Sequence, residues 1–288
     1  MIAHKPAWLK VRPGGGEAYG AIKRTLGELG LHTVCEEARC PNRGECWSSG
    51  TATFLVLGDT CTRGCRFCAV HRGNPGGRVD ASEPGRVARA VVTWGLRHVV
   101  ITCVTRDDLP DGGAAHLAAV VAALREHAPG VTVEVLASDF GGDAQAVRTL
   151  VDAGPDVFAH NLETVDRLQA RVRDPRCSVA RSLEVLRLAG TIRPGMVTKS
   201  ALLLGMGETA EEIRETLRAL RGVGVTSLTL GQYLAPSRAH VAVAEWIAPE
   251  TFEAWREEAH ALGFSMVASG PLVRSSYRAG ELLASGRV

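Results

Sequence analysis

The sequence alternates between short apolar, β-branched runs and longer stretches of helical periodicity, and this alternation restricts the fold more than any other feature. Seven runs are expected to be strands: Thr53–Leu57, His98–Thr102, Val131–Ala137, Asp156–His160, Val197–Leu204, Val225–Leu230 and Phe264–Ala268. Six stretches between them are expected to be helices: Glu83–Trp94, Ala114–His127, Asp143–Ala153, Val179–Ala189, Ala210–Leu220 and Pro249–Leu262. Because no Rossmann fingerprint accompanies the repeat, we expect an α/β chain with a barrel or partial barrel.

Three cysteines follow the first expected strand in a C-x3-C-x2-C array, at Cys61, Cys65 and Cys68. Three thiolates in so short a loop can hold one side of an iron–sulfur cube. With no fourth cysteine nearby, one iron keeps a position for a substrate or cofactor. A zinc loop or three redox thiols is the alternative. The loop follows the end of a strand, where barrel enzymes carry their active sites.

A second triplet precedes the first strand in a C-x4-C-x5-C array, at Cys35, Cys40 and Cys46. By spacing alone, a structural zinc site and an iron–sulfur site are about equally compatible with it.

The surrounding sequence resembles known families. The C-x3-C-x-aromatic-C loop resembles the cluster loop of the radical S-adenosylmethionine (SAM) superfamily. Five further strings are similar to the lipoyl synthase family in particular: VCEEARCPN from Val34, ECW from Glu45, RDDLPDGG from Arg106, HNLET from His160 and RSSY from Arg274. The resemblance covers nearly the whole chain. It is looser around Ala239 and Ala242, where the family has a basic residue and a proline.

The resemblance implies a partial (β/α)6 barrel at residues 51–268, with an N-terminal extension (1–50) and a C-terminal extension (269–288) that carry an auxiliary cluster. It implies two [4Fe–4S] clusters and SAM. Cys61, Cys65 and Cys68 would hold the radical SAM cluster. A further set would hold the auxiliary cluster, namely Cys35, Cys40, Cys46 and a serine of RSSY, Ser276 in preference to Ser275.

Polar residues after the later strands are candidates for SAM contacts. An amide and a carboxylate, Asn161 and Glu163, suit the diol of a ribose, and the resemblance places them at SAM. Lys199 could pair with the SAM carboxylate or form a salt bridge at the barrel rim. The resemblance places the acidic loop Thr105–Gly113 beside SAM, and a plain helix cap is the alternative. His160 is expected to be a satisfied core histidine. Two cysteines outside the triplets are not expected to take part, Cys103 as a small buried thiol and Cys177 as incidental.

The resemblance also implies a reaction. One electron would cleave SAM to a 5′-deoxyadenosyl radical, which takes hydrogen from an octanoyl chain, and the auxiliary cluster would give up sulfur at C6 and C8. The alternatives are a biotin-synthase-like or methylthiotransferase-like enzyme, a paralogue with another acyl substrate, and a non-catalytic protein stapled by zinc.

The implied partners are an octanoylated lipoyl carrier domain or H protein, a low-potential electron donor of the ferredoxin or flavodoxin type, and an iron–sulfur carrier. Net charge is only +2, which gives no argument for nucleic acid. From Leu57 to Arg106, however, eight arginines oppose three acidic residues, which is either a solvated face or a docking surface for an acidic partner.

The eight cysteines favour reduced thiols in a cytosol. No apolar run is long enough to span a membrane and no signal peptide is evident, so we expect a cytoplasmic protein without membrane contact. The first ten residues are expected to be extended and anchored by Trp8 and Leu9, before a helix at Glu17–Leu29.

Overall fold

The computed structural model describes residues 4–11, 14–48 and 52–285. The chain divides into two compact units. We call Val11–Arg63 with Ala69–Phe158 the N-terminal unit, and Met1–Lys10, Gly64–Cys68 and Ala159–Val288 the C-terminal unit. The expected division at 1–50, 51–268 and 269–288 remains a prediction, and its first boundary lies outside the described residues.

In the N-terminal unit, four strands of the main sheet lie in the order β1 (His32–Thr33), β2 (Thr53–Val56), β5 (His98–Cys103) and β6 (Thr132–Leu136). β1 is antiparallel to β2, and the other pairs are parallel. All four residues of β2 are buried, as expected for a strand covered on both faces. Two short strands, β3 (Thr60–Cys61) and β4 (His71–Arg72), pair separately on either side of the residues that carry Cys65 and Cys68 in the sequence.

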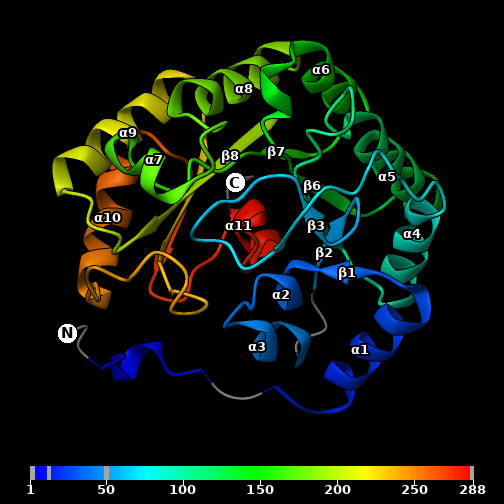
Figure 1. Ribbon diagram of the computed structural model, residues 1–288, viewed down its shortest axis with the longest axis horizontal. Helices are drawn as coiled ribbons and strands as arrows, with labels where there is room; N and C mark the ends of the chain where they lie inside the picture. The colour runs from blue at the N-terminus through cyan, green and yellow to red at the C-terminus, as the bar shows by residue number, and fades with distance from the viewer. Residues whose placement is uncertain (1–3, 12–13, 49–51, 286–288) are drawn as a thin grey trace. The chain divides into compact units, whose positions relative to one another are not determined.

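The helices of the N-terminal unit are α1 (Glu17–Leu29), α2 (Val34–Glu37), α3 (Arg43–Ser48), α4 (Glu83–Thr93), α5 (Ala114–His127), the 3-10 turn η2 (Phe140–Gly142) and α6 (Ala144–Asp152). Figure 1 shows α4, α5 and α6 side by side. Their inward faces are apolar, with Val87, Leu117 and Leu150 fully buried. Burial of these aliphatic faces is the main force that holds each helix in place.

In the C-terminal unit, three parallel strands lie in the order β8 (Val197–Leu204), β9 (Ser227–Gln232) and β10 (Met266–Gly270). Its helices are η1 (Ala7–Leu9), η3 (Asp166–Leu168), α7 (Gln169–Val172), α8 (Val179–Ile192), α9 (Ala210–Gly222), α10 (Pro249–Ala261) and α11 (Ala279–Ser285). β7 (Val157–Ala159) lies at the boundary of the two units. α9 begins with a capping box in which Thr209 and Glu212 satisfy each other's backbone N–H groups.

The expected repeat is confirmed, since β2, β5, β6, β7, β8 and β9 each precede one long helix and β10 closes the series. β9 and β10 begin two residues later than expected. The reason is that Val225 and Phe264 close the preceding helices: their N–H groups donate to the carbonyls of Leu220 and Ala259, 3.1 Å away in both cases. A left-handed glycine stands just before each, so these residues complete helix C-caps rather than start strands.

The N-terminal expectation is half right. Leu9 is fully buried and anchors the segment, but Trp8 is 44% exposed and does not. The segment also forms the short turn η1 instead of remaining extended, which turns Leu9 inward. Among the described helices, none combines the length and apolar character that crossing a membrane requires.

Candidate metal centres

The chain enters the first cysteine loop through a constrained residue in the N-terminal unit. Leu57, directly after β2, has φ 68°, a left-handed conformation that costs a non-glycine residue about 1–2 kcal/mol. Its N–H donates to the Glu83 carboxylate at 2.9 Å, and that carboxylate contacts Nε2 of His116 at 2.6 Å. Its carbonyl accepts from Arg106 at 3.3 Å. These buried partners fix the direction in which the chain leaves β2 for Cys61.

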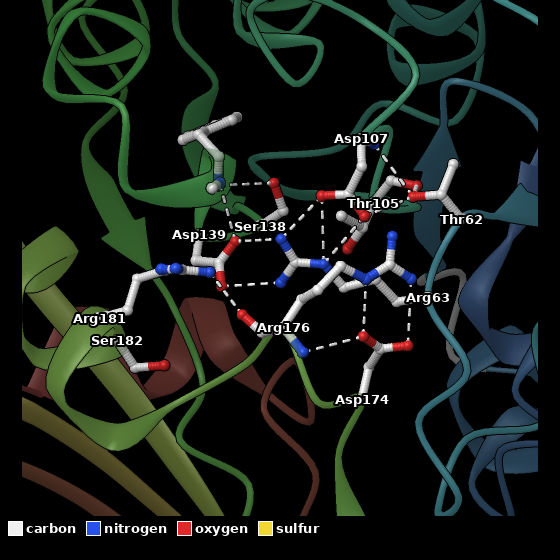
Figure 2. Close-up of polar contacts among 12 residues, drawn as sticks. Thr62, Arg63, Thr105, Asp107, Ser138, Asp139, Asp174, Arg176, Arg181 and Ser182 are labelled. Carbon is white, nitrogen blue, oxygen red and sulfur yellow. Dashed lines mark hydrogen bonds and ion pairs between the residues drawn. The ribbon is translucent and has the colours of Figure 1, made fainter.

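Arg63, between the first two cysteines of the loop, is held by two carboxylates. Its guanidinium donates to Asp139 at 2.6 and 2.7 Å and to Asp107 at 2.8 and 3.1 Å (Figure 2). The side chain is almost fully buried. Paired, charge-assisted hydrogen bonds of this kind fix orientation as well as distance. Thr62 adds a bond from its hydroxyl to Asp107 at 2.8 Å.

Cys61 lies in the same unit and its sulfur accepts the Arg63 N–H at 3.4 Å. Cys103 packs nearby against Leu55, Leu57 and Val104. Burial raises the pKa of the Cys103 thiol to about 12, although the whole residue is only half-buried, so the small buried thiol expected from the sequence is confirmed in part.

In the C-terminal unit, the Cys65 sulfur accepts the N–H of Asp174 at 3.3 Å. A hydrogen bond with the Cys177 thiol raises the pKa of Cys65. The Cys177 thiol thus lies against a candidate ligand, and the expectation that it is incidental stays a prediction. The Cys68 carbonyl contacts Nε2 of His240 at 3.1 Å. Sequence reasoning missed His240 because that loop matches the family only loosely.

Two cysteines of the second triplet lie on short helices of the N-terminal unit, and Cys40 lies in the connection between these helices. Cys35 is on α2, which Thr33 caps, and Cys46 is on α3. A bond from the Cys40 N–H to the Cys35 carbonyl at 3.1 Å keeps those two residues within one turn. Burial raises the pKa of Cys35 to about 11. Neither short helix was expected from the sequence, because four to six residues are too few to show a helical period.

The donor chemistry of the two cysteine triplets fits iron–sulfur clusters. Over residues 4–11, 14–48 and 52–285, no three His, Cys, Asp or Glu side chains are grouped closely enough to hold a metal ion. Two candidate ligands of the first loop nevertheless receive backbone N–H bonds at sulfur. Such bonds stabilise thiolates and tune cluster potentials, which a loop built only for packing does not require. All eight cysteines are free thiols.

The candidate SAM residues follow β7 in the C-terminal unit. The Asn161 side-chain nitrogen donates to Glu163 at 3.0 Å, and Glu163 has φ 68°. Burial raises the pKa of Glu163. In the described part of the chain, the buried Oδ1 of Asn161 has no hydrogen-bond partner. A buried acceptor left open beside a carboxylate fits the hydroxyl groups of a ligand such as a ribose.

The structure bears on two of three further expectations, those for His160 and Asp111 but not that for Lys199. His160 is buried and its Nε2 contacts Ser182 at 2.9 Å, so the satisfied core histidine is confirmed. Asp111 accepts the N–H groups of Gly113 and Ala115, so the helix-cap interpretation is confirmed for that residue. Lys199, on β8, is 2% exposed and its role stays a prediction.

The RSSY string lies beside the end of β9. Gly231 approaches the Val273 carbonyl so closely that a Cβ on residue 231 would stand 2.0 Å from that oxygen. The Tyr277 N–H donates to the Arg274 carbonyl at 3.0 Å, which folds Ser275 and Ser276 into a turn.

Comparison with known proteins decides the family. Residues 55–220 match the model of the radical SAM superfamily, and residues 2–40 match the N-terminal domain of lipoyl synthase. A lipoyl synthase of Thermus thermophilus is 56% identical over 276 residues, covering 96% of this chain and 85% of the relative. The chain belongs to the lipoyl synthase family. A chloroplastic lipoyl synthase of Arabidopsis thaliana is 53% identical over 283 residues, covering 96% of this chain and 72% of the relative.

Solved structures support the fold of this lipoyl synthase family member. Methylornithine synthase superposes with a TM-score of 0.58 at 15% identity, covering 88% of this chain and 76% of that one. SuiB of Streptococcus suis, bound to S-adenosylmethionine, gives a TM-score of 0.53 at 11% identity, covering 72% of this chain and 46% of that one. The expected α/β partial barrel is thereby confirmed.

Membership of the lipoyl synthase family makes the chain a radical SAM enzyme that inserts sulfur, with SAM and a [4Fe–4S] cluster among its cofactors. It argues against the methylthiotransferase-like, biotin-synthase-like and zinc-stapled alternatives.

Proposed function

We propose that the chain inserts two sulfur atoms, at C6 and C8, into an octanoyl group carried on a lysine of a carrier protein. The sulfur comes from an auxiliary [4Fe–4S] cluster. The observation that carries this proposal is the second cysteine triplet, placed ahead of a radical SAM loop in a chain that is 53–56% identical to curated lipoyl synthases. A radical SAM enzyme that only generates radicals needs no such triplet.

The two clusters have separate ligands in this proposal. Cys61, Cys65 and Cys68 hold the radical SAM cluster. The auxiliary cluster is held by Cys35, Cys40 and Cys46 with Ser276. When bound, the cofactors supply a carbon-centred radical that can take hydrogen from an unactivated carbon, and a source of sulfide.

In this proposal the chain's own residues bind SAM and orient the cluster loop. Asn161 and Glu163 offer an open acceptor and a carboxylate to the ribose of SAM, and Lys199 offers a positive charge to its carboxylate. Arg63, fixed by Asp107 and Asp139, holds the cluster loop in one conformation. Holding reacting groups in a fixed geometry removes much of the entropic barrier to reaction.

The carrier partner is proposed to dock on the arginine-rich segment 57–106. Arg72, Arg89 and Arg97 are exposed there, on β4, on α4 and directly before β5. Reversing all three to Glu should raise KM for an acidic carrier about tenfold at low salt, at about 0.5 kcal/mol per exposed pair. Reversal of Arg148, Arg171 and Arg256, which are exposed elsewhere, is the control. Equal KM values for the two triple variants would contradict the proposal that the carrier docks on segment 57–106.

Other partners remain predictions: a ferredoxin- or flavodoxin-type electron donor, and an iron–sulfur carrier that rebuilds the consumed cluster. The cytoplasmic location also remains a prediction. The plant relatives are named as chloroplastic.

Iron and acid-labile sulfide per chain test the proposal, on anaerobically prepared protein. We expect about eight irons in the parent, and about four in each of two variants, Cys35/Cys40/Cys46→Ala and Cys61/Cys65/Cys68→Ala. The first variant should still cleave SAM but transfer no sulfur to an octanoylated carrier.

Two outcomes would reject the proposal. If the parent contains zinc, and the Cys35/Cys40/Cys46→Ala variant loses this zinc but keeps the same iron content, the N-terminal triplet is a structural zinc site. Sulfur transfer by the first variant would place the sulfur source elsewhere.

A further inference from the structure

We propose that Asp174 is a positioning residue for the radical SAM cluster, because it clamps Gly64 and Cys65 in the middle of the cysteine loop. The proposal rests on the proposed function in one respect, the assignment of Cys65 as a cluster ligand. All residues concerned belong to the C-terminal unit.

Three hydrogen bonds join the loop to the segment that follows α7. The Arg66 N–H donates to the Val172 carbonyl at 2.8 Å. The Gly64 N–H donates to the Asp174 carboxylate at 2.8 Å. In the opposite direction, the Asp174 N–H donates to the Cys65 sulfur at 3.3 Å. Gly64, Cys65 and Arg66 are thus each tied to residues 172–174, and Asp174 supplies two of the three ties.

The sequence around Asp174 prepares this clamp. α7 ends at Val172, and Arg173 is extended. Pro175 disfavours a helical conformation at Asp174, so the helix cannot continue through it. Arg176 orients the carboxylate, with its side chain donating to both oxygens at 2.8 and 3.1 Å (Figure 2). This pairing lowers the pKa of Asp174. The carboxylate is 5% exposed, so it is a permanent acceptor shielded from water.

The contact at sulfur has a consequence for the cluster. A hydrogen bond to a ligand sulfur stabilises the more negative, reduced cluster and raises its reduction potential. The bond at sulfur comes from the backbone of Asp174, whereas its carboxylate accepts from the Gly64 N–H. It acts through Gly64, by holding the loop where the backbone N–H of residue 174 meets Cys65.

Two substitutions separate this role from a plain charge effect. Asp174→Asn removes the charge but keeps one acceptor oxygen within reach of Gly64. Asp174→Ala removes the charge and the acceptor together. Because both variants have the same net charge, their difference reports the clamp alone.

The experiment uses the full chain carrying Cys35/Cys40/Cys46→Ala, so that only the radical SAM cluster contributes signals. We expect the Asp174→Ala variant to have a lower reduction potential and shifted EPR g-values of the reduced cluster relative to Asp174→Asn. We also expect it to retain less iron per chain after desalting. A role in folding alone would lower Tm without separating the potentials of the two variants.

A second measurement does not depend on the clusters. Hydrogen exchange of the backbone amide of Gly64, in the cluster-free chain, should be faster in Asp174→Ala than in Asp174→Asn. If exchange differs but the background protein binds no iron, the clamp stands and the proposed cluster assignment fails. Equal exchange rates, or equal potentials and g-values in the two loaded variants, would overturn the proposal for Asp174.

Discussion

The guanidinium of Arg63 and the carboxylate of Asp139 form a buried, two-point ion pair, with N···O distances of 2.6 and 2.7 Å. The side chain of Asp139 is 0% exposed and that of Arg63 is 3% exposed. Asp139 is three residues past the end of β6, so the pair ties the cysteine loop to the end of a sheet strand. Asp107 still balances the Arg63 charge when Asp139 is removed, but the buried N–H groups that face Asp139 lose their acceptors.

Replacement of Asp139 by Ala should therefore be costly. We expect a loss of about 1–3 kcal/mol in the free energy of unfolding, measured by urea denaturation of the cluster-free chain. Arg187→Ala is the matched control, since Arg187 pairs with Glu184 at 2.7 Å but both are about half exposed. That variant should lose much less stability, because an exposed ion pair is screened by water. Similar losses in the two variants would mean that the Arg63 pair is not buried in solution.

Glu163→Gln should stabilise the cluster-free chain, in a way that depends on pH. Burial raises the pKa of Glu163 above its ordinary 4.5 in the folded state. The stability it contributes is present in full below pH 4.5 and is lost as pH rises through the folded-state pKa. Because Gln does not ionise, the variant does not lose this stability as pH rises. Tm of the variant should therefore match the parent near pH 4 and exceed it at pH 7.5, by about 2–4 °C per kcal/mol.

The same variant should bind SAM more weakly, because it lacks the carboxylate that accepts two hydroxyl bonds. Glu211→Gln is the control, because its expected change in Tm has the opposite sign. Glu211 is exposed and Arg218 lowers its pKa, so its replacement should lower Tm slightly at pH 7.5. A Glu163→Gln variant less stable than the parent at pH 7.5 would show that Arg173 and Arg274 outweigh burial at this site.

The sequence predicted the order of strands and helices well, because the hydrophobic period is local. The limits of β8, α1 and α5 agree to the residue. It could not predict where a helix cap ends and a strand begins. At Val225, for example, the boundary depends on a hydrogen bond from its N–H to the Leu220 carbonyl, five residues earlier. α2 and α3 were missed because their helical turns are too short to repeat a pattern.

The candidate site, too, was predictable from the sequence only in part. Motif spacing predicted the six cysteines as ligands, but their support comes from distant parts of the chain. Asp174 lies 109 residues from Cys65, and Asp139 lies 76 from Arg63. No local pattern in the sequence marks either carboxylate. The contact between Cys177 and Cys65 was missed for the same reason, because only the folded chain brings the two together.

Gly231→Ala should displace the RSSY turn. A Cβ there would stand 2.0 Å from the Val273 carbonyl oxygen, a backbone atom that cannot rotate away. We expect a loss of stability of about 1–3 kcal/mol, as for other overpacked sites, and less iron in the auxiliary cluster. Gly222→Ala is the control, because a Cβ at that helical position meets nothing within 4 Å. It should stabilise the chain by up to about 1 kcal/mol. Equal iron contents in the two variants would show that the RSSY turn does not help to hold the auxiliary cluster.

The two serines of the RSSY turn can be separated by iron content in the Cys61/Cys65/Cys68→Ala background, where only the auxiliary cluster remains. If Ser276 is the fourth ligand, Ser276→Ala should lose one iron of about four, or the whole cluster, while Ser275→Ala keeps all of them. Ser276→Cys should restore iron, because thiolate is a better ligand for the cluster than an alkoxide. In a chain that keeps Cys61, Cys65 and Cys68, Ser276→Cys should transfer sulfur more slowly than the parent, since the stronger ligand is harder to displace. Loss of iron in Ser275→Ala alone would assign the ligand to Ser275, and unchanged iron in both alanine variants would show that neither serine binds the cluster.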